Sequence, residues 1–164
     1  MPSSSKPRKR FVPGAAVYRA KLKKLNRMTI ADTCDSVRVR NHESLLAMTN
    51  GSGQDGHWKD VAEAINVALV LSEKLYDGAY QKELLLAAVA HAKCGARRHR
   101  TGSFGYTGEE LQQVNTAMDV HDAQLDDITF GELCKAHAEV KRRQACQPTL
   151  TPHNVHEREK DYAS

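Results

Sequence analysis

Long apolar runs are missing from the sequence. The uninterrupted apolar stretches, such as residues 67–71 and 84–90, have at most seven residues, whereas a transmembrane helix needs roughly 18 apolar residues. The basic N-terminal residues are also not followed by the apolar stretch of about 7–15 residues that an export signal requires. We therefore expect a cytoplasmic protein that makes no membrane contact.

Motifs of common enzyme families are missing as well. The glycine-rich stretches 51–53 and 102–105 lack the preceding strand and the Gly-Lys-Ser/Thr ending of a phosphate-binding loop. There is neither a Gly-x-Ser-x-Gly nucleophile turn nor a His-Glu-x-x-His zinc motif. The sequence therefore predicts no catalytic residues, no cofactor and a protein that is not an enzyme.

Acidic residues are missing from the first 27 positions, and basic residues are missing from positions 101–134. Residues 1–40 contain eleven Lys and Arg against two Asp, a net charge of +9, and the remainder carries −5. A segment with charges of one sign repels itself and buries little apolar surface. We expect a flexible basic arm (1–31), a helical domain (32–146) and a disordered polar tail (147–164).

The domain itself has the apolar spacing of helices and almost no two-residue alternation. This spacing predicts an all-α fold, a compact bundle of about four helices. The helix expected over 58–76 is apolar nearly all round at 64–71, which places it at the centre. The first helix is expected to start at Asp32 or Asp35, although residues 37–40 also fit a short strand.

Two later helix starts carry the strongest local signals. Thr107 with Glu110, and Thr129 with Glu132, are capping boxes, in which a threonine and a glutamate three residues later satisfy each other's backbone amides. We therefore expect helices to begin at these two threonines.

These motifs together resemble small proteobacterial phage, prophage and plasmid-borne proteins of uncharacterised function. The resemblance spans about residues 36–135 and is carried by Asn41-His42-Glu43, Trp58, Ala64-Ile65-Asn66-Val67-Ala68, Thr101-Gly102, Thr107-Gly108-Glu109-Glu110-Leu111 and Met118-Asp119-Val120-His121-Asp122. It implies an accessory protein of a mobile genetic element and no catalytic residues.

Two pairs of metal-ligating residues lie on expected helices. His91 with Cys94, and Cys134 with His137, each place two ligand types three positions apart. Together they could form a tetrahedral Cys2His2 zinc site in a zinc-stabilised domain or a small metalloenzyme. Buried thiols and hydrogen-bonded core histidines explain the same pattern. His121, between Asp119 and Asp122, is likewise expected to be a core histidine.

The basic arm favours contact with nucleic acid. Flexible lysines and arginines neutralise phosphates and release counterions, which gives affinity that falls with salt. A second basic run at residues 97–100 could extend this surface, and the alternative for the arm is a solubilising role. The candidate residues are Lys6, Arg8, Lys9, Arg10, Arg19, Lys21, Lys23, Lys24 and Arg27.

The acidic stretch suggests a different partner. Asp119, Asp122, Asp126 and Asp127 are expected to share a surface that could bind a basic site on a protein or be covered by the chain's own arm. The leading hypothesis is a non-enzymatic binding or regulatory accessory protein that contacts nucleic acid through its arm. The alternative is a modulator or inhibitor of a host protein that acts through the acidic face at 119–132.

Overall fold

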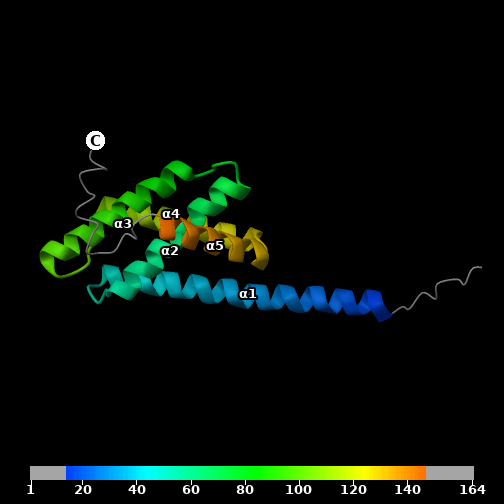
Figure 1. The fold of residues 1–164 in the computed structure, drawn as a ribbon. Helices are drawn as coiled ribbons and strands as arrows, with labels where there is room; N and C mark the ends of the chain where they lie inside the picture. The colour runs from blue at the N-terminus through cyan, green and yellow to red at the C-terminus, as the bar shows by residue number, and fades with distance from the viewer. Residues whose placement is uncertain (1–13, 147–164) are drawn as a thin grey trace, which may run out of the picture.

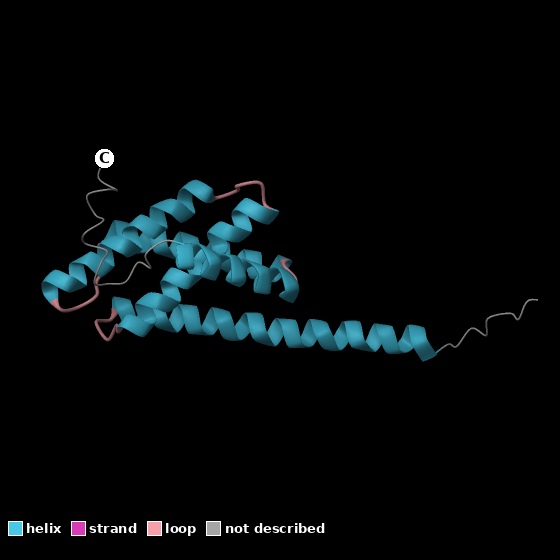
Figure 2. Ribbon diagram, viewed as in Figure 1, coloured by secondary structure: helices cyan, strands magenta, loops and turns pink. Residues whose placement is uncertain are grey.

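The computed structural model describes the backbone of residues 14–146 and the side chains of residues 32–146. All of its regular elements are helices, as Figure 2 shows. The five are α1 (Gly14–Thr49), α2 (Asp55–Leu75), α3 (Gln81–Thr101), α4 (Gly108–Asp127) and α5 (Phe130–Cys146). The all-α prediction is confirmed, with five helices in this part of the chain where about four were expected. Residues 37–40 are helical.

The first helix is much longer than expected. It spans 36 residues from Gly14, so residues 14–31, assigned from sequence to the arm, are helical in the structure. Figure 1 shows this end of α1 extending past the other helices. Alanine, leucine, lysine and arginine, all strong helix formers, make up most of residues 15–25. Their helix propensity outweighs the repulsion between neighbouring lysines, which is worth only a few tenths of a kcal/mol per pair.

The second helix lies at the centre of the bundle, as predicted. It packs against α1, α3, α4 and α5. Its first half contributes Trp58, Val61 and Ile65 to one apolar cluster with α3 and the first half of α4. Its second half contributes Val67, Val70 and Leu71 to another cluster with the end of α4 and with α5.

Both predicted capping boxes are present, at the starts of α4 and α5. Thr107 accepts a hydrogen bond from the amide of Glu110 at 3.3 Å, and the Glu110 carboxylate accepts one from the Thr107 amide at 2.8 Å. The same exchange occurs between Thr129 and Glu132. Each cap satisfies amides that the first helical turn leaves unpaired. The starts of α4 and α5 are therefore encoded locally.

The connection between α2 and α3 has an unusual backbone. Asp77, Gly78 and Tyr80 all adopt positive φ, of 51°, 77° and 60°. This left-handed region is unfavourable for a bulky residue such as tyrosine. Tyr80, which precedes the first residue of α3, is 62% exposed.

Candidate functional site

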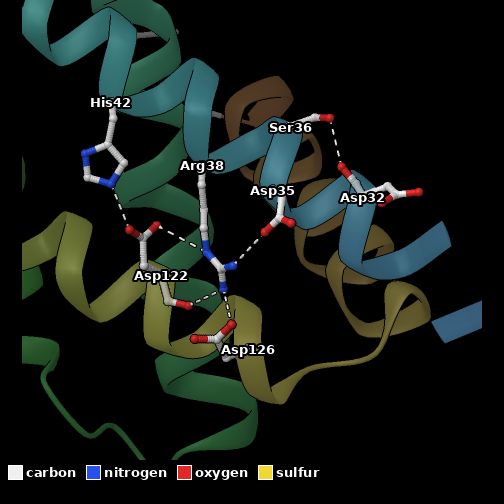
Figure 3. Close-up of polar contacts among 7 residues, drawn as sticks. All are labelled: Asp32, Asp35, Ser36, Arg38, His42, Asp122 and Asp126. Carbon is white, nitrogen blue, oxygen red and sulfur yellow. Dashed lines mark hydrogen bonds and ion pairs between the residues drawn. The ribbon is translucent and has the colours of Figure 1, made fainter. Parts of the chain in front are cut away.

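A cluster of charged side chains joins α1 to α4 (Figure 3). Arg38 donates hydrogen bonds to the Asp35 carboxylate at 3.0 Å and to the Asp122 backbone carbonyl at 2.9 Å, and it also bonds the Asp126 carboxylate. One turn later, Nε2 of His42 lies 2.7 Å from Oδ2 of Asp122. Together with the buried Cys34 one turn earlier, this cluster holds α1 against α4, and the basic residues 19–27 lie N-terminal to both contacts.

The sequence did not identify Arg38 or His42 as site residues. A signal was present nonetheless, because Arg38 and His42 are four positions apart, as are Asp122 and Asp126. Residues at this spacing share one face of a helix. Basic residues on one helix and acidic residues on the other, at the same spacing, would have indicated that α1 and α4 pack with these faces together.

The four predicted acidic residues do not form one surface. Asp122 and Asp126 face α1 and are paired there with Arg38. Asp119 and Asp127 instead line a groove that α4 forms with the α2–α3 connection and the start of α3. Asp127 accepts a hydrogen bond from the Tyr76 hydroxyl at 3.1 Å, which together with burial raises the pKa of Tyr76. The acidic face is therefore divided between an internal contact and an open groove.

The structure does not bring the four predicted metal ligands together. Among the described residues, no group of three or more His, Cys, Asp or Glu side chains is arranged to hold a metal ion. Cys134 is exposed on α5, and His137 contacts Glu63 of α2 at 2.9 Å. His91 and Cys94 are buried in α3. Cys94 lies among apolar side chains, and burial raises the pKa of its thiol to about 11.

His91 belongs to a buried hydrogen-bond network. Its Nε2 donates to the Trp58 carbonyl at 2.9 Å, and its Nδ1 lies 2.6 Å from the Tyr106 hydroxyl. The Trp58 ring stacks on the imidazole at a centroid distance of 4.8 Å and donates to the His91 carbonyl. Burial lowers the pKa of His91 to about 4, although the bond to the Trp58 carbonyl acts in the opposite direction. The network joins α2, α3 and the loop before α4.

Gly95 permits this packing. A Cβ at this position would lie 2.9 Å from Nε1 of Trp58, closer than side chains tolerate. The absence of a side chain on α3 therefore lets the helix approach the indole.

His121 is also a core residue, as predicted, but its surroundings differ. It is 1% exposed, and burial lowers its pKa to about 4. Its Nδ1 has no hydrogen-bond partner among the described residues, and the same holds for both amide atoms of Asn41 and for Oε1 of Gln124. Asn66, the amide expected to be buried, is only half-buried in α2. The incomplete polar contacts therefore lie on α1 and α4.

The predicted nucleic-acid residues fall on different parts of the chain. Arg19, Lys21, Lys23, Lys24 and Arg27 lie in α1, while Lys6, Arg8, Lys9 and Arg10 lie outside the described residues. In the second basic run, Arg97 forms a two-point ion pair with Glu110, at 2.8 and 3.0 Å, and Arg98 pairs with Asp55 at 3.0 Å. Although burial acts to raise it, these Arg97 bonds hold the pKa of Glu110 below its usual value. These two arginines stabilise the fold.

Comparison with known proteins adds no relative: no protein-family model, curated protein or solved structure matches this chain. In the part of the chain that the structure describes, no helix combines the length and the hydrophobicity needed to cross a membrane.

Proposed function

We propose that the protein is a non-enzymatic, cytoplasmic accessory protein that binds nucleic acid through the basic N-terminal part of α1. The observation that carries this proposal is the helix itself. Residues 14–31 contain five Lys and Arg and no acidic residue, and they are helical and extend past the bundle (Figure 1). The resemblance at residues 36–135 supports a role in a mobile genetic element.

The dimensions of the helix suit a duplex. An α-helix with its side chains is about 10–12 Å across, and the major groove of B-DNA is about 12 Å wide. Lysines and arginines on such a helix contact phosphates on both sides of the groove, so that binding depends on charge more than on sequence. In the bundle, Arg38, Arg97, Arg98 and Arg143 are paired with acidic residues. The N-terminal part of α1 is therefore the better phosphate-binding surface.

Fluorescence anisotropy with a labelled 20-base-pair duplex tests the proposal. We expect the full chain to bind with strong salt dependence and the variant with Lys21→Gln, Lys23→Gln, Lys24→Gln and Arg27→Gln to bind more weakly. Each lost phosphate contact lowers the slope of log K against log salt by about 0.9, so the slope should fall by up to about 3.6.

A control variant removes the same charge from the bundle. Lys59, Lys74, Lys82 and Lys93 are exposed on α2 and α3, and changing all four to Gln alters the net charge equally. We expect this control to keep most of the affinity and of the salt slope. Equal weakening of both variants would show attraction by net charge alone, and absence of duplex binding by the full chain would also overturn the proposal.

A further inference from the structure

The groove between α4 and the α2–α3 connection combines a largely apolar lining with several carboxylates. Its volume is about 440 Å³. Three carboxylates (Glu83, Asp119 and Asp127) and two tyrosines (Tyr76 and Tyr80) line it, and none of its lining residues is basic. Neither Glu83 nor Asp119 forms an ion pair within the described part of the chain.

The position of these acids on α4 separates them from the paired ones. Asp119 and Asp127 both line the groove, together with Ala123 and Gln124 of the same helix. Asp122 and Asp126 lie on the side that α1 covers. The charge on the groove side is thus left without a counterpart in the described structure.

A second, independent feature points to a ligand that donates hydrogen bonds. Gln124, only 6% exposed, also lines the groove. Its Nε2 donates to the Ala68 carbonyl at 3.2 Å, whereas Oε1 has no partner among the described residues. An unpaired buried acceptor costs about 1–3 kcal/mol. A donor that reached the floor of the groove would offset that cost.

The arrangement favours an arginine side chain over a small cation. Within the described residues, the groove carboxylates are not arranged around one point where a metal ion could bind. Each carboxylate would therefore pair with a different positively charged group of the ligand. Tyr80 lines the groove and is 62% exposed, so its ring is accessible to a planar guanidinium, which stacks on aromatic rings and also pairs with carboxylates. A peptide with several arginines supplies these contacts together.

We propose that this groove binds an arginine-containing basic segment of a partner protein. The site lies on α4, on the α2–α3 connection and at the start of α3, and it includes none of residues 19–27, so it is independent of the proposed nucleic-acid function. Variants in the groove leave the basic part of α1 unchanged, and either proposal can fail without the other.

The test uses the full-length chain and a capped hexa-arginine peptide, with binding measured by titration calorimetry. We expect the double variant Asp119→Asn and Asp127→Asn to raise Kd by at least about tenfold, a loss of about 1.4 kcal/mol. Asparagine at 127 keeps an acceptor for the Tyr76 hydroxyl, so the fold is preserved. The matched control, Glu43→Gln with Glu109→Gln, removes two exposed acids outside the groove and should change Kd by less than about twofold.

Tyr80 provides a second readout. Tyr80→Phe keeps the aromatic face and should preserve binding, while Tyr80→Ala should weaken it by about three- to tenfold. If the groove variant and the control variant weaken peptide binding equally, the proposal is wrong. It is also wrong if spermine binds as tightly as the peptide and the groove variant weakens that binding. Groove-dependent association of the chain with itself in sedimentation experiments would also overturn it, because the occupant would then be a second copy.

Discussion

His91 and His121 are both almost completely buried, at 3% and 1% exposure, yet they belong to different kinds of junction. Both ring nitrogens of His91 have partners, supplied by Trp58 and Tyr106. Nδ1 of His121 has none among the described residues. Paired polar groups fix one arrangement of a core, whereas an unpaired buried group lowers stability. The α2–α3 junction is therefore more tightly specified than the contact of α4 with α1.

Acid should affect both junctions and gives the largest expected effect. The two histidines have a pKa of about 4 in the folded protein, below the usual value of about 6.5. Between these values the unfolded chain binds two protons that the folded chain does not, so the free energy of unfolding falls as pH falls. The expected loss is about 3 kcal/mol per histidine on going from pH 7 to below pH 4.

Urea denaturation at pH 7, 6, 5 and 4.5 measures this loss in the range above most carboxylate titrations. A free energy of unfolding that stays constant across these four pH values would contradict the assignment of both histidines as neutral core residues.

Replacing His91 with leucine should give the next largest effect. His91→Leu removes the stacking on Trp58 and the hydrogen bonds to Trp58 and Tyr106. We expect the free energy of unfolding at pH 7 to fall by about 2–4 kcal/mol, because buried partners lose their bonds. Urea denaturation followed by circular dichroism measures this change in the free energy of unfolding. The variant should also unfold with one fewer proton taken up at pH 5.

The matched change at the other junction should have the smallest effect. His121→Leu replaces a side chain with an unpaired nitrogen by an apolar one of similar size, and such exchanges are often nearly neutral. We expect a change within about 1 kcal/mol of zero at pH 7. If His121→Leu destabilises the protein as strongly as His91→Leu, the two junctions do not differ in the way proposed.

Local signals in the sequence predicted some of these features correctly. The starts of α4 and α5 were predictable because a capping box needs only residues three positions apart, as with Thr107 and Glu110. The central place of α2 followed from its apolar surface at residues 64–71. The burial of His91 and His121 followed from their positions on apolar stripes.

Contacts between distant residues were beyond the sequence. The partners of His91 and Arg38 lie up to 33 and 88 positions away. No local pattern selects those of His91, and the spacing that Arg38 and His42 share with Asp122 and Asp126 marks matching faces without selecting this pairing over others. The exposure of Cys134 was also missed, because its thiol was expected to be a metal ligand or buried, whereas Ala136 is the buried residue at this turn of α5. A small rotation of a short helix exchanges neighbouring stripes. Which acidic residues of α4 are paired depends on where α1 packs, and this position is not encoded in a local pattern.

The N-terminal part of α1 is a long helical arm that leaves the bundle near Cys34, a buried residue of the cluster shared with α2, α4 and α5. From Cys34 to Gly14 the helix has 20 residue steps, or about 30 Å at 1.5 Å per residue. A tilt of about 10° at this contact would move the far end by about 5 Å, about one and a half base-pair steps of a duplex. Because the neighbouring ion pairs of Arg38 are partly exposed, salt weakens them. Rearrangements too small to disturb the bundle would thus be amplified at the basic end.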